Sequence, residues 1–290
     1  MLTRRSFLVT SALAAALPKA LLADPRKRFR TLPAAFAQLE KANAARLGVF
    51  VLDTSTDENS GYRADERFAM CSTFKFLVAA AILERVDKNQ ESLTRAIAIP
   101  AKVTLGSSPV TLEHAGASMI IRDLCSAIIT RSDNTAANLL LDTIGGPSRI
   151  TRFAQSLGDK VTRLDRTENT LNEARPGDPR DTTSPAAMVA DWQKLLLGNT
   201  LSPTSRQLLT DWIIASKTGA DRLRAGLPGT WRVGDRTGSN GEDTTNNVAI
   251  LWPPNQPPLL IAAYLTHCPG PESKRNAILA DVARLVAATI

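Results

Sequence analysis

Residues 247–266 read NVAILWPPNQPPLLIAAYLT, and this stretch gives the strongest indication of the fold. Two apolar runs lie on either side of a turn made of prolines, asparagine and glutamine. Such runs are typical of buried strands, and a short connection between two strands favours antiparallel pairing. We therefore predict two neighbouring strands, Asn247–Trp252 and Leu259–Thr266.

Further strand and helix signals lie on both sides of this stretch. Thr230–Asp235 is a third strand candidate, and Leu47–Leu52 reads as a buried strand with a hairpin partner at Gly61–Tyr62. Apolar residues recur at helical spacing within residues 33–45 and from Glu272 to Ala288. These segments together predict an antiparallel five-stranded sheet flanked by helices.

The middle of the chain has a different character, because its apolar residues follow a helical repeat. Phe76, Leu83 and Val86 illustrate this spacing. Ser184–Pro185 and Ser202–Pro203 each combine a helix cap with a proline suited to a first helical turn. The sequence therefore predicts several helices between the strands at the two ends.

These patterns predict an α+β fold with an inserted helical domain behind a cleavable leader. The predicted boundaries are residues 1–23 for the leader, 24–66 and 213–290 for the sheet domain, and 67–212 for the all-helical domain, which carries a loop at residues 163–181.

The leader has the pattern of a twin-arginine signal peptide. An arginine pair at residues 4–5 precedes an apolar stretch, Leu8–Leu17, and small residues follow before Pro25. The apolar stretch is too short to span a bilayer. We expect cleavage of the leader, export to a bacterial periplasm and no membrane contact of the mature chain.

The composition is that of a soluble globular protein. Of the 290 residues, 43% are hydrophobic and 22% are charged, which excludes disordered, collagen-like and coiled-coil chains. The formal net charge is +7, or about +4 without the leader, and no basic block contains interleaved aromatic residues. We expect no nucleic-acid partner, and nothing in the sequence indicates more than a monomer.

The histidines and cysteines are too few and too dispersed to hold a metal ion. His114 and His267 are the two histidines, and Cys71, Cys125 and Cys268 are the three cysteines. Neither set has the spacing of a metal site, so we predict no metal and no cofactor. Any hydrolytic chemistry must then take its base from lysine, glutamate or aspartate.

Four short motifs carry groups suited to nucleophilic catalysis. Ser72–Lys75 is an S-x-x-K at a predicted helix start, where the hydroxyl and the amine share one face and free N–H groups can bind an oxyanion. Ser132–Asn134 reads S-D-N between two apolar helices. Glu168–Asn172 lies in a helix-poor stretch, and Arg236–Gly238 ends a strand.

In this order, S-x-x-K, S-D-N, E-x-x-x-N and [K/R]-T-G resemble the class A serine β-lactamases. The resemblance covers nearly the whole chain after the leader and implies the family's two-part fold and hydrolysis of the β-lactam ring amide. It implies that Ser72 forms an acyl-enzyme, that Lys75 assists proton removal and that Ser132 protonates the leaving nitrogen. Glu168, with Asn172, would activate the deacylating water. The sequence leaves open whether Lys75 or Glu168 is the base for acylation.

The resemblance also implies which residues bind the substrate and close the loop. The substrate-binding residues would be Asn134, Asn172, Arg236, Thr237, Gly238, Ser239 and Arg222. Within this set, Asn134 would bind a side-chain amide of the substrate. The backbone N–H groups of Ser72 and Ser239 would form an oxyanion hole. Arg166 and Asp181 occupy the places where the family closes the loop with an ion pair.

Two positions depart from the family pattern. The expected Lys-Thr-Gly reads Arg236-Thr237-Gly238, whereas a literal Lys217-Thr218-Gly219 lies in a turn after a helical stretch. We assign the motif to Arg236 because it belongs to a strand, and arginine suits a carboxylate better than it suits proton transfer. An arginine expected on the next strand is replaced by Thr245, for which Arg222 is a candidate substitute; the alternative is that Arg222 is a surface residue of a loop.

Two other functions remain as alternatives. A DD-peptidase shares S-x-x-K and K-T-G but lacks the deacylating glutamate, so Glu168 with Asn172 argues against it. A non-hydrolysing β-lactam sensor acylates and stays acylated, and the absence of a recognisable second functional domain argues against it. The predicted partner is a small β-lactam substrate.

Overall fold

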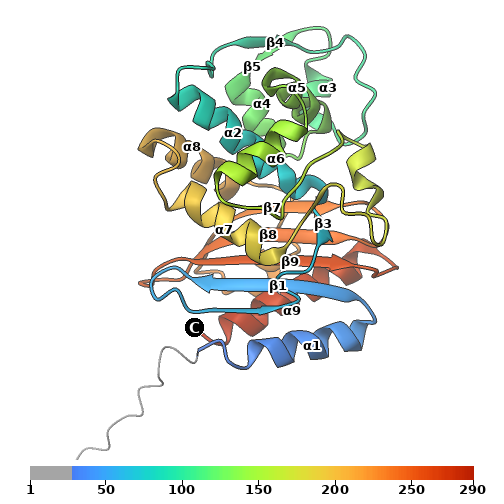
Figure 1. Cartoon of the computed structure of the whole chain (residues 1–290). Coiled ribbons are helices and arrows are strands. Elements are labelled where there is room, and N and C mark those ends of the chain that lie inside the picture. The colour runs from blue at the N-terminus through green and yellow to red at the C-terminus, as the bar shows by residue number, and fades with distance from the viewer. Residues whose placement is uncertain (1–27) are drawn as a thin grey trace, which may run out of the picture.

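A five-stranded antiparallel sheet runs through the protein, as the computed structural model of residues 28–290 shows (Figure 1). Its order is β2-β1-β9-β8-β7, so strands from both ends of the chain lie side by side. The strands are β1 (Arg46–Asp53), β2 (Asn59–Tyr62), β7 (Arg232–Ser239), β8 (Thr245–Trp252) and β9 (Leu259–Thr266). The predicted leader lies outside the described residues.

Helices cover both faces of this sheet. α1 and α9 pack on one face, and the remaining helices lie on the other side, where α7 and α8 contact the strands directly (Figure 1). The α-helices are α1 (Leu32–Asn43), α2 (Lys75–Asp87), α3 (Pro109–Glu113), α4 (Ile121–Thr130), α5 (Asn134–Ile144), α6 (Ser148–Ser156), α7 (Pro185–Leu196), α8 (Pro203–Ile214) and α9 (Glu272–Ala287). The 3₁₀ turns among the described residues are η2 (Cys71–Phe74), η3 (Thr170–Glu173) and η4 (Leu223–Gly226). Among residues 28–290, no helix has the length and apolar character needed to cross a membrane.

The central strands separate two apolar cores. In β9, Ile261 and Ala263 point to the core beneath α1 and α9, while Leu260 and Tyr264 point to the core shared with the helical part. This alternation follows from the two-residue period of a strand. Both faces are buried, which explains why the stretch at 247–266 reads as continuous apolar runs. The predicted α+β fold is confirmed.

The strand that carries Arg236 is longer than predicted. β7 runs from Arg232 to Ser239 rather than from Thr230 to Asp235, so Arg236-Thr237-Gly238 forms its last part, as expected of a motif that ends a strand. The ladder with β8 extends to the pair Ser239–Thr245, and these backbone hydrogen bonds stabilise an extended chain whose side chains are polar.

The sequence predicts that segment 67–212 is all helical, but the structure contains short strands there as well. It contains the paired strands β3 (Phe68–Ala69) and β6 (Thr182–Thr183), and a second pair, β4 (Ala96–Ala98) and β5 (Ser118–Ile120). Two- and three-residue strands leave no recognisable period in a sequence.

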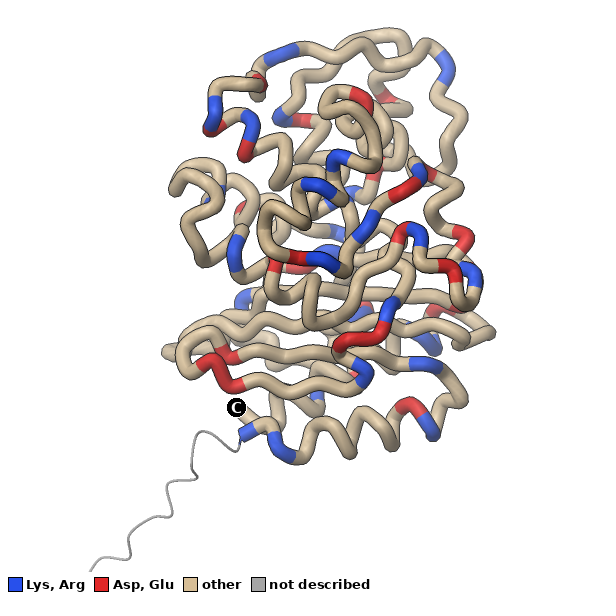
Figure 2. The backbone as a smooth tube through the Cα atoms, in the orientation of Figure 1, with Lys and Arg blue, Asp and Glu red and all other residues tan. Residues whose placement is uncertain are grey.

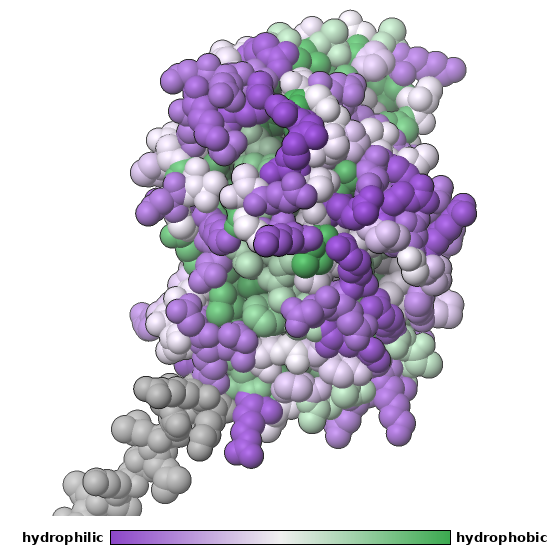
Figure 3. Space-filling model, in the orientation of Figure 1, coloured by the Kyte–Doolittle hydropathy of each residue, from purple (hydrophilic) through white to green (hydrophobic). Residues whose placement is uncertain are grey.

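The surface in view is mixed in charge and mainly hydrophilic. Lysine, arginine, aspartate and glutamate residues are interspersed along the backbone in Figure 2. Figure 3 shows hydrophilic side chains over most of this face, with smaller apolar areas between them. Among the described residues, Leu112 and Leu197 are the large hydrophobic side chains that are strongly exposed.

Candidate active site

The serine and the lysine of the first motif meet where η2 runs into α2. Lys75 Nζ donates a hydrogen bond to Ser72 Oγ over 3.0 Å, as their three-residue spacing predicts. The Ser72 hydroxyl in turn donates to Glu168 Oε1 over 3.2 Å. Ser72 therefore sits between an amine and a carboxylate, both buried.

Lys75 is completely buried in a polar cluster. Its ammonium group lies 2.9 Å from Glu168 Oε1 and donates to Asn134 Oδ1 over 2.5 Å and to the Ser132 carbonyl over 2.9 Å. Burial lowers the pKa of Lys75 to about 8; the charge of Arg236 acts in the same direction, and Glu168 opposes both. A lysine with this pKa exchanges its proton near neutral pH.

The S-D-N motif forms the turn between α4 and α5. Ser132 has a φ of 59°, in the left-handed region. Asp133 caps α5 by accepting from Ala136 N over 2.9 Å, and its other oxygen accepts from Thr111 N over 2.9 Å. The turn is thus bound to α3, which contains Thr111, and Ser132 and Asn134 are held against Lys75.

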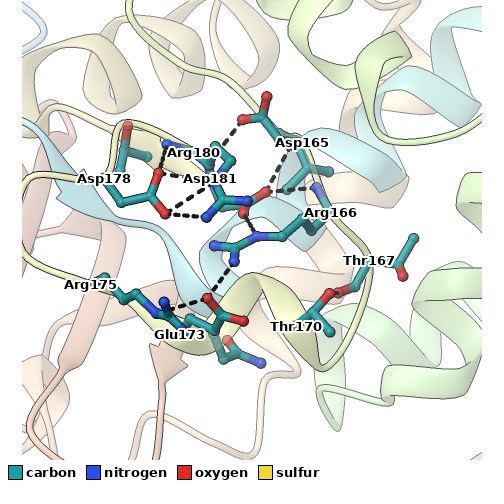
Figure 4. A network of polar contacts seen from close by, with 12 residues as sticks. Asp165, Arg166, Thr167, Thr170, Glu173, Arg175, Asp178, Arg180 and Asp181 are labelled. Atoms are coloured by element: carbon teal, nitrogen blue, oxygen red, sulfur yellow. Dashed lines mark hydrogen bonds and ion pairs between the residues drawn. The ribbon is translucent and has the colours of Figure 1, made fainter.

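The loop that carries Glu168 is closed by an arginine-centred network (Figure 4). Arg166 Nε pairs with Asp181 Oδ2 at 2.6 Å, and its NH1 group pairs with Glu173 Oε2 at 2.9 Å. The second oxygen of Asp181 accepts from the backbone N–H of Asp165 at 2.7 Å and of Arg166 at 2.9 Å. Asp181 is fully buried, so this pair differs from a solvated surface ion pair.

Hydrogen bonds hold both the side chain and the backbone of Glu168. Asn172 Nδ2 donates to Glu168 Oε2 over 2.7 Å, and Asn172 Oδ1 is buried without a partner among the described residues. Asn138 on α5 accepts from Glu168 N and donates to Glu168 O, both at 2.9 Å. Sequence reasoning missed Asn138. Its spacing of four from Asn134, on one face of α5, was the available signal.

β7 brings Arg236 to the same cluster. Arg236 is fully buried, and its NH2 group donates to Ser132 Oγ over 2.7 Å. Burial lowers its pKa, although a guanidinium remains charged in proteins. Lys217, from the alternative Lys-Thr-Gly, is exposed after α8. The structure therefore brings Arg236, and not Lys217, to Ser132.

Gly238 allows β7 to approach the nucleophile closely. A Cβ at this position would lie 2.6 Å from Met70 O and 3.1 Å from Ser72 N. Both contacts are with backbone atoms, which cannot move aside cheaply. The strand and the residues before α2 can thus form one wall only with glycine here.

Thr237 and Arg222 lie at the outer end of this wall. Thr237 Oγ1 is 2.6 Å from Thr218 Oγ1. Arg222 is buried, and its guanidinium donates to Gly238 O at 2.9 Å and Asn246 O at 2.8 Å and pairs with Glu272 at 2.9 Å. Arg222 is thus largely occupied by the protein rather than lying free on the surface.

Part of this cluster lines one cavity of about 760 Å³, whereas Lys75, Glu168 and Arg236 are buried and are not among its lining residues. Ser72, Ser132, Asn134, Asn172, Arg222, Thr237, Gly238 and Ser239 are among its lining residues. The described residues contain no cluster of three or more histidine, cysteine or carboxylate ligands that could hold a metal. The arrangement suits acyl transfer, because the candidate nucleophile Ser72 lines the cavity and two buried candidate bases, Lys75 and Glu168, contact its hydroxyl.

Comparison with known proteins agrees with this geometry. The family described as the β-lactamase enzyme family matches residues 31–290. β-Lactamase L2 of Stenotrophomonas maltophilia is 46% identical, with 98% of each chain covered. A solved class A β-lactamase described as that of the last common ancestor of Gram-negative bacteria is 57% identical, with a TM-score of 0.87. The match covers 89% of this chain and 98% of that one. The chain belongs to the class A β-lactamases. It is a hydrolase of the β-lactamase type, and the predicted resemblance is confirmed.

A solved β-lactamase from Xanthomonas campestris extends the agreement. It is 48% identical with a TM-score of 0.88, and 90% of this chain and 98% of that chain are covered.

In the present β-lactamase the three cysteines, Cys71, Cys125 and Cys268, are buried and free. Burial raises the pKa of the Cys71 thiol beside the nucleophile, so this thiol stays protonated and inert.

Proposed function

We propose that this β-lactamase opens the β-lactam amide through an acyl-enzyme on Ser72, which a water activated by Glu168 then hydrolyses. The proposal rests above all on the position of Ser72 Oγ, 3.0 Å from Lys75 Nζ and 3.2 Å from Glu168 Oε1. A weak nucleophile needs an adjacent base, and here two candidate bases touch it.

In the proposed acylation, Ser72 Oγ attacks the ring carbonyl and its proton passes to the Lys75–Glu168 pair. The ring C–N bond then breaks, Ser132 donates a proton to the nitrogen, and the proton taken from Ser72 passes through Lys75 to Ser132 Oγ, 3.3 Å away. Ser132 Oγ already accepts from Arg236 at 2.7 Å and from Lys75 at 3.3 Å, so its own hydrogen is available for donation. The backbone N–H groups of Ser72 and Ser239 would bind the oxyanion.

In the proposed deacylation, Glu168 removes a proton from water, which attacks the ester carbon. The C–O bond to Ser72 then breaks, and the proton passes from Glu168 to Ser72 Oγ, 3.2 Å away. The unpartnered Asn172 Oδ1 beside Glu168 supports this role, because a water can donate to both residues at once. The fastening of Glu168 by Asn138 and by the Arg166–Asp181 pair would limit the movement of the base.

We propose that Arg236 and Thr237 bind the substrate carboxylate and that Asn134 binds its side-chain amide. Arg222 adds positive charge to the same region while it holds the Gly238 carbonyl.

The proposed domain division places the cleft between the sheet part, 24–66 and 213–290, and the helical part, 67–212. Export to the periplasm by the twin-arginine route, and a monomeric state, remain proposals from the sequence.

Replacing Arg236 with alanine is expected to weaken the use of carboxylate-bearing substrates. Loss of one charge-assisted contact costs roughly 1.5–3 kcal/mol, which corresponds to about 10- to 150-fold in kcat/KM. Lys217→Ala is the matched control and should leave the kinetics unchanged, because Lys217 is exposed. Steady-state kinetics of both variants with a penicillin and with its methyl ester show whether a loss depends on the carboxylate of the substrate. A loss confined to Lys217→Ala would show that the motif was assigned to the wrong lysine or arginine.

The proposed function is tested by mass spectrometry of the protein after brief mixing with a penicillin or a chromogenic cephalosporin. We expect rapid colour change and return of the protein mass to its free value. A persistent adduct on the Ser72 peptide without turnover would instead indicate a DD-peptidase or a sensor. An adduct on another residue would contradict the assignment of the nucleophile.

A further inference from the structure

A pair of buried aspartates at the base of the Glu168 loop takes no part in the chemistry described above. Asp191, on α7, is 1% exposed, and neither of its carboxylate oxygens has a partner among the described residues. Asp159, before the loop, is 7% exposed, and its Oδ2 is likewise without a partner. Buried polar atoms are almost always paired, so these three oxygens require an explanation.

The two carboxyl groups satisfy one another if they share a proton. The charge of Asp159 and a side-chain hydrogen bond with it both act on Asp191, and two adjacent buried carboxylates cannot both be ionised. Asp159 Oδ1 accepts from Val161 N at 2.6 Å and from Thr162 N at 3.0 Å, whereas neither oxygen of Asp191 has a donor among the described residues. Burial raises the pKa of Asp191, so this residue can keep a proton and donate it to the free Oδ2 of Asp159.

Few other charges act on this pair. Lys194, one turn further along α7, is the cation that acts on Asp191, and its ammonium group donates to the Leu157 carbonyl. Tyr264 of β9 is the other titratable group nearby, and burial raises its pKa, so it stays neutral. Next to Asp191, Trp192 stacks on Phe76 of α2, which keeps α7 packed in apolar surroundings. Burial, followed by the charge of Asp159, raises the pKa of Asp191 to about 9.

The pair joins the chain that enters the loop to the helix that follows it. Asp159 holds Thr162, whose hydroxyl lies 2.6 Å from the hydroxyl of Thr183 at the loop exit. Arg163 N also donates to Thr182 O at 3.0 Å. A bond between Asp159 and Asp191 would thus add a link from the loop entry to α7.

We propose that Asp191 is a positioning residue for deacylation: it shares its proton with Asp159, and this buried bond fastens the base of the loop that carries Glu168. The inference rests on the proposed role of Glu168. When Asp191 ionises, the bond becomes a repulsion between two carboxylates, the loop entry separates from α7, and Glu168 loses its position. Acylation by Ser72 and Lys75 is less affected, because both residues belong to η2 and α2.

The test compares the rate of acyl-enzyme loss between pH 6 and 10.5 in the wild type, Asp191→Asn and the control Asp211→Asn. Asp211 lies exposed on α8, so its variant should follow the wild type. An amide at 191 donates as the protonated acid does but cannot ionise. Wild-type deacylation should fall about tenfold per pH unit above pH 9. Asp191→Asn should deacylate like the wild type at pH 7 and should lose at least tenfold less activity by pH 10.

Two further variants separate the possible failures. Asp191→Leu leaves Asp159 without its donor and should deacylate at least about tenfold more slowly at pH 7, a loss that asparagine at the same position avoids. Glu168→Gln should accumulate acyl-enzyme at every pH; if it acylates and still turns over like the wild type, the proposed function fails. If Glu168→Gln accumulates acyl-enzyme but wild type and Asp191→Asn decline identically at high pH, the role of Asp191 is refuted.

Thermal unfolding gives a readout that does not depend on turnover. The folded-state pKa of Asp191 is raised, so its contribution to stability is full below its ordinary pKa near 4 and is lost as pH rises towards 9. The midpoint of the wild type should therefore fall relative to that of Asp191→Asn as pH rises through this window. Parallel curves would contradict the shared proton.

Discussion

Replacement of Ser72 by alanine is expected to abolish acylation, with a fall in kcat/KM of at least about 10⁴-fold. The Ser72 hydroxyl accepts from Lys75 and donates to Glu168, and among the described residues no other hydroxyl contacts both groups. The cleft would keep Asn134, Arg236 and Thr237, so substrate should still bind without forming an adduct. Mass spectrometry after mixing with a penicillin, together with a binding isotherm, measures both properties.

The control for this variant is Ser156→Ala, on the exposed face of α6 and remote from the cavity. It should acylate and turn over as the wild type does. A Ser72→Ala protein that still forms a covalent adduct would assign the nucleophile elsewhere, and Ser132 would be the next residue to replace. Loss of binding together with acylation would instead indicate that the cleft had collapsed.

Features that depend on local sequence were predicted well. The serines before α7 and α8 cap those helices through Ala187 N and Ser205 N, and a proline follows each serine. The strands at 247–266 differ from the prediction by at most two residues at either end. In each case the determining contacts lie within a few residues, so a single sequence contains them.

Features that depend on distant contacts were missed. Asn138 meets Glu168 across 30 positions of the chain, and α5 alone does not indicate that its polar face is covered by a loop. Asp191 reads in the sequence as a polar residue on an amphipathic helix, yet the loop entry buries it. β7 extends through Ser239 because β8 supplies a hydrogen-bonding partner, which propensity does not include.

The four motifs are an intermediate case. Their order indicated a common site, but distances between them are set by the sheet and by the fastened loop. Arg236 reaches Ser132 because Gly238 lets β7 approach η2, and Glu168 reaches Ser72 because Asp181 gathers the backbone before it. The residue types were therefore predictable, whereas the direct contact of Ser72 with both Lys75 and Glu168 required the structure.

Glu168→Gln is expected to convert the enzyme into one that acylates and then stops. Glutamine fills the same volume but cannot take a proton from water, and loss of a general base slows a step by about 10²–10⁴-fold. The ion pair with Lys75 at 2.9 Å is lost as well, and because Glu168 raises the pKa of Lys75, that pKa should fall below about 8. More Lys75 is then neutral at pH 7 and able to accept the proton of Ser72.

The measurement is the burst of colour from a chromogenic cephalosporin, followed by the mass of the protein. We expect one equivalent of product in the burst, little turnover afterwards and an adduct on the Ser72 peptide. Glu113→Gln, on the exposed side of α3, should turn over normally. If Glu168→Gln fails to acylate at all, Glu168 rather than Lys75 is the base for the first step. Continued turnover at the wild-type rate would show that deacylation does not need the carboxylate of Glu168.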